Sequence, residues 1–251
     1  RLGPVDILVN NVGGSRARSD ILETSLEDFK GTFDLNLFGG FQLMKLALPH
    51  MRDQKWGRII NIASIWGREY GGNISYMSTK AAVIGATKHA GVTLAKDGIL
   101  VNSIAPGSIE HPGGGWERFR KENPPDVVEE FIEDNLPMGR FGWPEPVGDL
   151  VAFLASERAG LITGACIVVD DGLDRFLDAG GVQDRYPLGE GPVDVLEVPV
   201  ELEQGCGDDG HVALRRFHIA DVPQGEDALL ALADEDPPVR HGVQDARGVF
   251  Q

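Results

Sequence analysis

The stretch Arg58-Ile-Ile-Asn-Ile-Ala-Ser64, followed by Tyr76-Met-Ser-Thr-Lys80, is the most informative part of this chain. The first part is an apolar run typical of a buried strand, and the residues after the lysine are typical of a helix. Residues four apart share one face of a helix, so Tyr76 and Lys80 are expected side by side, with Ser64 opposite them at the strand end. The stretch therefore predicts a strand, a loop and a helix that bring three polar side chains together.

Strand-like and helix-like runs alternate along most of the chain. Strands are expected near residues 6–10, 58–63, 100–104 and 166–169. Helices are expected near residues 25–50, 75–96, 127–135 and 146–156. Strands that alternate with helices favour a parallel sheet with right-handed crossovers, so the pattern predicts an α/β fold.

The pairing of a phenol with an ammonium has a chemical consequence. A free phenol has a pKa of about 10, and a nearby positive charge stabilises the phenolate and lowers that pKa. The phenol then becomes a general acid and base that works near neutral pH. A tyrosine and a lysine four residues apart are common by chance, so their meaning depends on the motifs around them.

Five matches in a fixed order provide this context, and together they resemble the short-chain dehydrogenase/reductase family, in particular its members similar to 3-oxoacyl-carrier-protein reductases. The matches are Asp6-Ile-Leu-Val-Asn-Asn-Val-Gly-Gly14, Phe33-Asp-Leu-Asn-Leu-Phe-Gly-Gly40, the group Ser64, Tyr76 and Lys80, Asn102-Ser-Ile-Ala-Pro-Gly-Ser-Ile109, and Gly164-Ala-Cys-Ile-Val-Val-Asp-Asp-Gly172. Val12 stands where the family usually has Ala, and Asp171 where it usually has Gly. The resemblance covers about residues 1–175 and implies the C-terminal part of a Rossmann-like, doubly wound parallel sheet.

The resemblance also implies a reaction, in which a hydride passes between the nicotinamide of NAD or NADP and a carbonyl or secondary alcohol carbon of a small molecule. Tyr76 would be the general acid and base, Ser64 would orient the substrate oxygen, Lys80 would hold the nicotinamide ribose, and Asn36 would position a water molecule. The residues implied to contact the cofactor are Asn11, Gly13, Tyr76, Lys80, Pro106, Gly107 and Ile109. NAD and NADP are not distinguished, because that choice lies at the end of the family's second strand.

Each catalytic candidate also has a simpler structural interpretation. A tyrosine on an amphipathic helix usually packs its ring against the protein and leaves its hydroxyl in water, and a lysine four residues later is usually a solvated charge. Ser64 could simply end a strand, and Asn36 could cap or bridge backbone groups. For each residue alone the structural interpretation is favoured, whereas the four residues in the family's order and spacing favour a catalytic origin.

The family begins with a strand, a Gly-rich turn and a helix that hold the cofactor pyrophosphate, and no such pattern precedes Asp6. We therefore expect a chain without the first βα units, in which the strand near residues 6–10 is a bare apolar edge of the sheet. Such a fragment could be inactive as it stands.

From about residue 176 the resemblance ends, which predicts two domains, residues 1–175 and an acidic tail of residues 176–251 with weak β structure or disorder. Within the tail, residues 193–202 suit an edge strand, residues 211–222 a short strand or a helix, and residues from 234 onward disorder. Gly205-Cys-Gly-Asp-Asp-Gly210 has the spacing of a dinucleotide motif, but a turn is favoured because Asp208 and Asp209 would repel a pyrophosphate.

Residues 110–142 follow the Asn102–Ile109 motif and contain His111-Pro-Gly-Gly-Gly-Trp116. Glycine hinges and an aromatic residue suit a flap that closes over a substrate, and the place resembles the mobile lid of the family. The alternative is a surface excursion that Trp116 anchors to the core.

Composition excludes several other classes of protein. The net charge is −16, with 23 acidic and 18 basic side chains in residues 1–175 and 16 acidic and 5 basic in residues 176–251. An acidic surface argues against nucleic acid or an anionic membrane as partner, and no apolar run is long enough to cross a bilayer. Cys166 and Cys206 have no disulfide or metal spacing, and no metal site is expected. We therefore expect a cytoplasmic protein, with Cys166 as a core thiol.

Three functions fit this sequence. The first is a nicotinamide-dependent oxidoreductase, and the second a non-catalytic remnant retained as an oligomer partner. The third is a fusion whose acidic tail binds another protein. The resemblance also implies a homo-oligomer, formed through the helices near residues 32–50 and 75–96. Cofactor binding separates the first function from the other two.

Overall fold

The computed structural model describes residues 3–15, 21–172 and 217–219 of the chain. Its parallel strands form one sheet in the order β4-β3-β2-β1-β5. The strands are β1 (Ile7–Asn10), β2 (Gly57–Ile62), β3 (Ile99–Pro106), β4 (Cys166–Val169) and β5 (Phe217–Ile219). The predicted parallel sheet is confirmed, and its first four strands lie where the sequence placed them, although β3 continues to Pro106.

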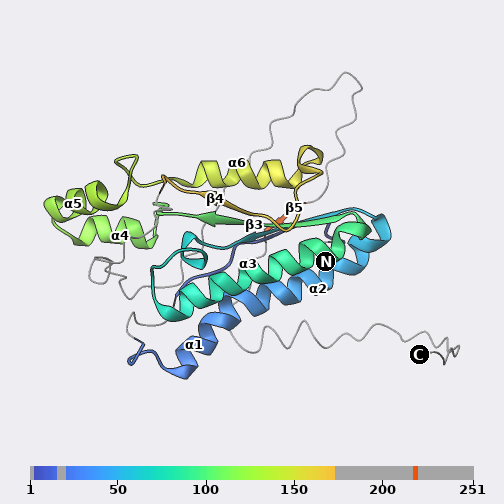
Figure 1. Cartoon of the computed structure of the whole chain (residues 1–251), viewed down its shortest axis with the longest axis horizontal. Helices are drawn as coiled ribbons and strands as arrows, with labels where there is room; N and C mark the ends of the chain where they lie inside the picture. Colours follow the sequence, from blue (N-terminus) through green and yellow to red (C-terminus); the bar gives the residue numbers. More distant parts are fainter. Residues whose placement is uncertain (1–2, 16–20, 173–216, 220–251) are drawn as a thin grey trace, which may run out of the picture. The chain divides into compact units, whose positions relative to one another are not determined.

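Helices cover both faces of this sheet (Figure 1). α6 (Pro144–Ala155) lies on one face, and α2 (Gly39–Gln54) and α3 (Ile74–Leu94) lie on the other. α4 (Gly115–Glu122) and α5 (Pro125–Asn135) lie beyond the carboxyl ends of the strands. Short 3-10 turns are η2 (Ile65–Gly67), η3 (Ala95–Asp97) and η4 (Glu157–Ala159). Helices on both faces make the sheet doubly wound, as the resemblance implied.

The helix expected over residues 25–50 consists of three parts. α1 (Leu26–Phe33) begins at Ser25, whose side chain accepts a hydrogen bond from the backbone N–H of Asp28. A π-helical turn, η1 (Asp34–Phe38), follows it and leads directly into α2. Such π-helical turns are frequent at functional sites, and apolar periodicity does not reveal them.

The strands β1, β2 and β3 each supply side chains to two separate cores. Ile59 of β2 packs in the same cluster as Met51 of α2, whereas the next residue, Ile60, packs in the cluster of Val151 of α6. Successive side chains of a strand point to opposite faces, so a strand covered on both faces must be apolar throughout. This explains why residues 58–63 form a nearly continuous apolar run instead of an alternating one.

The outer edge of β1 differs from the expectation. The sequence predicted a bare edge, but β5 pairs with β1 in parallel, from Ile7 opposite Phe217 to Val9 opposite Ile219. An uncovered edge strand presents a row of backbone N–H and C=O groups without partners. The pairing with β5 provides partners for some of these groups of β1. Of the two structures predicted for residues 211–222, the described part is a strand.

The other predictions for the tail lie outside the described residues. They concern the edge strand at 193–202, the turn at 205–210, the disorder from 234 onward and the thiol of Cys206. The domain boundary at residue 175 also stays a prediction.

Residues 109–142 form a segment that is closed at its base. Ile109 bridges to Gly142, the N–H of Glu110 donates to the carbonyl of Gly142 over 2.9 Å, and the N–H of Gly142 donates to the carbonyl of Ser108 over 2.9 Å. The two ends of the segment are therefore held side by side at the carboxyl end of β3.

An aromatic cluster fills this 109–142 segment. The ring centroids of Phe119, Phe131 and Phe141 lie 5.9, 5.0 and 5.1 Å from that of Trp116. The cluster is separate from the two cores of the sheet. The alternative in which Trp116 anchors the segment to the main core is therefore not met, because Trp116 packs within the segment itself. The mobile lid stays a prediction.

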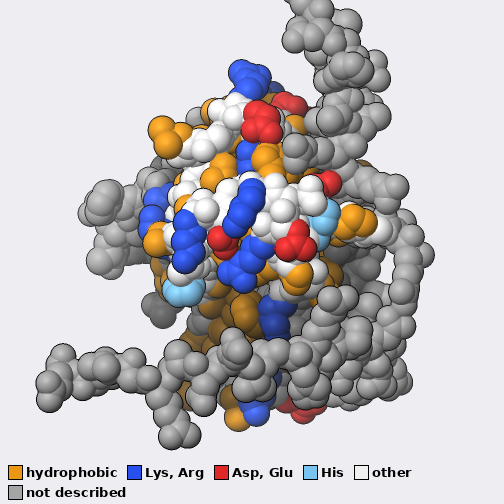
Figure 2. Space-filling view, turned by 90° about the vertical axis from the view of Figure 1, so that its right-hand side faces the viewer, with side chains coloured by type: hydrophobic (Ala, Val, Ile, Leu, Met, Phe, Trp, Pro, Cys, Tyr) orange, Lys and Arg blue, Asp and Glu red, His pale blue; other side chains and the backbone are white. Residues whose placement is uncertain are grey.

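Basic side chains gather at the end of the sheet where the strands begin (Figure 2). Arg52, Lys55, Lys96 and Arg158 are exposed there, in and after the turns that end α2, α3 and α6. The acidic excess of the chain is therefore not uniform over this part of the molecule. Among the helices in the described ranges, none combines the length and the hydropathy that crossing a bilayer needs.

Candidate active site

Three segments that are distant in the sequence meet at the carboxyl ends of β1 and β2. The loop Asn11–Ser15 follows β1, Ser64 follows β2, and the first turns of α3 carry Tyr76 and Lys80. Ligands of open α/β sheets bind beyond the carboxyl ends of the strands, so this is the expected place for a site.

Lys80 lies at the centre of this place. Its side chain is 3% exposed, and its Nζ donates a hydrogen bond of 2.9 Å to the carbonyl oxygen of Ile62. The same Nζ lies 5.5 Å from the centroid of the Tyr76 ring. Burial lowers the pKa of Lys80 to about 8, because removal from water disfavours the charged form. An ammonium has three N–H donors, so Lys80 can also serve ligand hydroxyls from this position.

Tyr76 lies in the first turn of α3, and that turn is fixed by an N-cap that the sequence prediction missed. The side chain of Asn73 accepts a hydrogen bond of 2.9 Å from the backbone N–H of Tyr76. The Tyr76 ring packs against the cluster of Ile65 and Trp66. The sequence did contain a signal for this cap, because asparagine is a preferred N-cap residue whose side chain accepts from the N–H two or three residues later.

Asn36 is buried in the π-helical turn η1 and holds the loop Asn11–Ser15. Its Oδ1 accepts from the N–H of Gly14 over 3.1 Å, and its Nδ2 donates to the carbonyl of Gly14 over 2.7 Å. The Nδ2 also donates to the carbonyl of Thr32 over 2.8 Å. Asn36 thus bridges backbone groups, which was the structural interpretation, and its role toward a water molecule stays a prediction.

Ser64 is buried directly after β2. Its Oγ accepts a hydrogen bond of 3.2 Å from the backbone N–H of Trp66 and caps the turn η2. The structural interpretation of Ser64 is therefore also met. A serine hydroxyl that accepts still has its own O–H to donate, so this bond leaves a role toward a substrate oxygen open.

Gly13 brings the loop Asn11–Ser15 against the other site residues. A methyl group at Gly13 would lie 2.7 Å from Oδ1 of Asn36 and 3.0 Å from Nζ of Lys80, so a side chain there would displace one of them. A buried ammonium beside a backbone without a side chain suits the hydroxyls of a nicotinamide ribose. Asn11, the buried residue after β1, lies in the same loop.

The remaining predicted cofactor residues lie at the carboxyl end of β3. Pro106 ends that strand, and the N–H of Gly107 donates to the carbonyl of Val169 over 3.0 Å. A methyl group at Gly107 would lie 2.3 Å from Cβ of Asp170, so the turn tolerates only glycine. Ile109 begins the 109–142 segment, which places this motif between β4 and the base of that segment.

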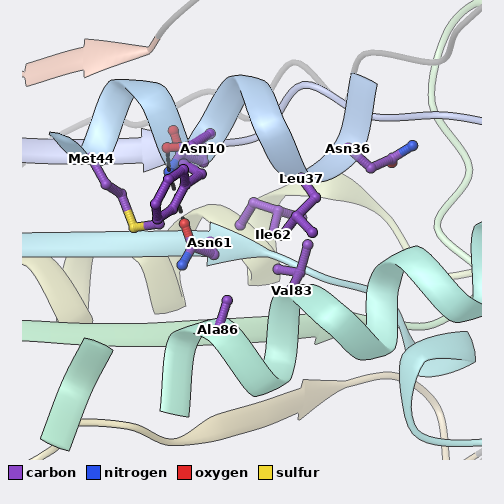
Figure 3. A pocket seen from close by; sticks show the side chains of 10 residues that line it. Asn10, Asn36, Leu37, Met44, Asn61, Ile62, Val83 and Ala86 are labelled. Carbon is purple, nitrogen blue, oxygen red and sulfur yellow. Dashed lines mark hydrogen bonds between the residues drawn. The ribbon is translucent and has the colours of Figure 1, made fainter. Parts of the chain in front are cut away.

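A chain of side-chain hydrogen bonds joins β1, β2 and α3. The Nδ2 of Asn10 donates to Oδ1 of Asn61 over 2.8 Å (Figure 3). The Nδ2 of Asn61 in turn donates to Oγ1 of Thr87 of α3 over 2.8 Å. A cavity of about 20 Å³ beside them is lined by Asn10, Asn36 and Asn61 together with apolar residues. That volume suits one water molecule, not a substrate.

The described residues contain no cluster of metal ligands, and their one cysteine is a free thiol. Within the described ranges, no group of three or more His, Cys, Asp or Glu side chains could hold a metal ion. Cys166 is a free thiol in β4 and is half-buried, so it is less enclosed than the core position predicted for it.

The amino-acid sequence resembles characterised proteins over the same region as the described fold. The sequence profile of the family described as enoyl-(acyl carrier protein) reductase matches residues 1–174. The 3-oxoacyl-[acyl-carrier-protein] reductase of Thermotoga maritima is 37% identical over 175 residues, which cover 69% of this chain and 68% of that protein.

Solved structures of similar proteins hold nicotinamide cofactors. ElxO, solved with NADP bound, has 37% sequence identity and a TM-score of 0.61, covering 67% of this chain and 66% of that one. A 3-oxoacyl-[acyl-carrier protein] reductase from Brucella melitensis, solved with bound NAD, has 31% identity and a TM-score of 0.58, covering 66% of this chain and 61% of that one. This chain thus matches somewhat less than two thirds of each structure. These matches agree with the order of the motifs and with the parallel sheet, so the chain belongs to the short-chain dehydrogenase/reductase family.

Proposed function

We propose that this chain carries the reaction centre of an NAD- or NADP-dependent oxidoreductase that interconverts a carbonyl and a secondary alcohol. The observation that supports this most is the burial of Lys80 between Gly13, the Tyr76 ring and the carbonyl of Ile62. A solvated helix charge would not be buried. Burial of an ammonium is unfavourable, and buried ionisable groups of this kind are typical of functional sites.

Four residues of the chain have different roles in this reaction. When bound, the nicotinamide supplies or accepts the hydride. Tyr76 gives a proton to the substrate oxygen during reduction and takes it back during oxidation. Ser64 donates a hydrogen bond to that oxygen and orients it, and the Lys80 ammonium stabilises negative charge on Tyr76. Asn36 holds the loop against which the cofactor would lie, and it positions a water molecule for the proton path.

A 3-oxoacyl thioester is the substrate class to test first, since the Thermotoga maritima relative is named for that reaction. We expect the chain to oxidise NADH or NADPH in the presence of acetoacetyl-CoA. Tyr76→Phe removes the proton donor and keeps the ring, so the rate should fall at least about a hundredfold. Tyr70→Phe is the matched control, because Tyr70 is 52% exposed and lies before the first turn of α3.

Near-normal turnover by Tyr76→Phe would contradict the assignment of Tyr76. If the folded wild-type chain neither turns over acetoacetyl-CoA nor binds NADH or NADPH by calorimetry, the proposal fails for this chain. The remaining functions would then be a non-catalytic partner in an assembly and a fusion whose acidic tail binds another protein.

We propose in addition that the chain self-associates through α2 and α3. Phe41 and Leu46 of α2 and Val92 of α3 are 49%, 60% and 65% exposed, which is unusual for large apolar side chains on two neighbouring helices. Light scattering after gel filtration would test this. Leu46→Glu should lower the mass of the particle, and an unchanged mass, or a monomeric wild type, would contradict the proposal.

A further inference from the structure

Asn73 makes more contacts than the cap of a helix requires. Its side chain is buried, with 2% exposed. Its Oδ1 accepts hydrogen bonds from the N–H of Tyr76 and from Oγ of Ser75, each over 2.9 Å. Its Nδ2 donates to Oγ of Ser15, which lies on a different segment. One amide therefore joins the start of α3 to the loop Asn11–Ser15.

The choice of asparagine is informative. Serine, threonine and aspartate cap helices about as well, and each supplies the acceptor oxygen that the N–H of Tyr76 needs. Among these side chains only that of asparagine also carries an N–H₂ group that can donate. The hydrogen bond to Ser15 uses that group, so the residue type fits the connection to the loop as well as the cap.

The loop Asn11–Ser15 is held from its other side by the reaction centre. Both backbone groups of Gly14 bond to Asn36, and Gly13 lies against Nζ of Lys80. The loop is therefore clamped between Asn36 and Asn73. A shift of the loop at Ser15 would be transmitted through Asn73 to the backbone of Tyr76.

We propose that Asn73 and Ser15 form a latch that fixes the position of Tyr76 relative to the loop on which the cofactor would lie. This inference rests on the proposed function of Tyr76. Asn73 and Ser15 are positioning residues, since they act through Tyr76 and the loop. A displacement of about 1 Å from the reactive geometry can lower a rate about a hundredfold, so a partial loosening should lower kcat by about tenfold.

The first test needs no cofactor and follows amide hydrogen exchange in the whole chain. Ser15→Ala removes the hydroxyl from the latch and leaves the cap of α3 intact. We expect the amides of Gly14 and Tyr76 to exchange at least about threefold faster in this variant, whereas Ser15→Thr, which keeps the hydroxyl, should match the wild type. Unchanged exchange at Tyr76 in Ser15→Ala would overturn the latch.

The second test separates positioning from stability by steady-state kinetics with acetoacetyl-CoA and NADPH or NADH. Asn73→Ser keeps an acceptor for the cap but is too short to reach Ser15. We expect Asn73→Ser and Ser15→Ala each to lower kcat about tenfold with little change in KM, and the double variant to be no worse than either. Ser25→Ala, which removes the cap of α1, is the control and should leave kcat unchanged.

The outcomes distinguish this inference from the proposed function. If kcat is unchanged in both single variants of an active chain, Asn73 is a cap only and the latch is wrong. If the wild type shows no turnover, the proposed function fails, and the exchange of the Tyr76 amide in Ser15→Ala still decides whether the latch exists.

Discussion

Two buried clusters lie beyond the carboxyl ends of the strands, and they are built from opposite kinds of side chain. The cluster around Lys80 consists of a buried ammonium, the side chains of Asn36 and Asn73 and the backbone of a glycine-containing loop. The cluster of the 109–142 segment consists of Trp116 and phenylalanines, packed edge to face, tilted or stacked against one another. Both are ordered, but the physical reasons differ.

The difference lies in what burial does to each cluster. Burial of aromatic rings stabilises the fold, through the area removed from water and the ring contacts. Burial of an ammonium destabilises it, and the lowered pKa of Lys80 records that cost. The 109–142 segment thus contributes its own stability, whereas the reaction centre depends on the stability of the sheet.

The largest effect should come from removing a ring in the aromatic cluster. Phe131 is 6% exposed and contacts Trp116, Phe119 and Phe141. Phe131→Ala should lower the stability of the 109–142 segment by about 3–5 kcal/mol, the usual cost of a buried phenylalanine. Amide hydrogen exchange of α4 and α5 would measure this loss, and the amides of β2 and β3 should keep their protection.

Phe38→Ala is the control for this change. Phe38 is 50% exposed, so its removal should alter stability by no more than about 0.5 kcal/mol. If Phe131→Ala lowers the protection of β2 and β3 as much as that of α4, the 109–142 segment is part of the main core, and the contrast between the two clusters is wrong.

The next effect has the opposite sign and concerns Lys80. Lys80→Met replaces the buried ammonium by an apolar side chain of similar length. A pKa of about 8 instead of 10.5 corresponds to about 3 kcal/mol, of which the lost bond to Ile62 would offset about 1 kcal/mol. The free energy of unfolding at pH 7 should therefore rise by about 2 kcal/mol while catalysis is lost. Denaturant unfolding would measure it, with the exposed Lys88→Met as control.

The pH dependence of stability gives an independent measurement on Lys80. The unfolded chain has the higher pKa, so unfolding takes up a proton between about pH 8 and 10.5. The contribution of Lys80 to the free energy of unfolding should therefore increase as the pH rises through that window. Lys80→Met should lack this increase, and an equal slope in both proteins would show that burial does not perturb Lys80.

The contrast between the clusters also explains which features the sequence could predict. Four strands and most helices were predicted because apolar periodicity is local, as in the run from Arg58 to Ala63. The nearness of Tyr76 and Lys80 was predicted because a helix has a fixed period. The π-helical turn around Asn36 was missed, since it follows from one extra residue per turn, which leaves no pattern of polarity.

Contacts between segments that are distant along the chain could not be predicted from the sequence. The cap by Asn73 was open to prediction from residue type alone, but its bond to Ser15 depends on how the loop after β1 meets α3. The pairing of β5 with β1 depends on a segment that follows the four other strands by many residues. Packing of Trp116 against apolar residues was one alternative open from the sequence, whereas the separate cluster of phenylalanines that it joins was not predictable.

The smallest expected effect concerns the ion pair that accompanies the aromatic cluster. Arg120 of α4 donates from one nitrogen to both carboxylate oxygens of Glu110, over 2.9 and 2.7 Å, near the closed base of the segment. Its side chain is 51% exposed, so water screens the pair and it should contribute less than about 1 kcal/mol.

Arg120→Ala should therefore change the exchange of α4 amides far less than Phe131→Ala does. The single variant Glu110→Gln and the double variant with Arg120→Ala complete a cycle that isolates the energy of the pair. The difference from wild type should shrink further in about 1 M salt, where charges at this distance are strongly screened. A loss as large as that of Phe131→Ala, insensitive to salt, would mean that charge and not aromatic packing holds the segment. In that case electrostatics and not apolar packing would decide the stability of both clusters, and the distinction between them would disappear.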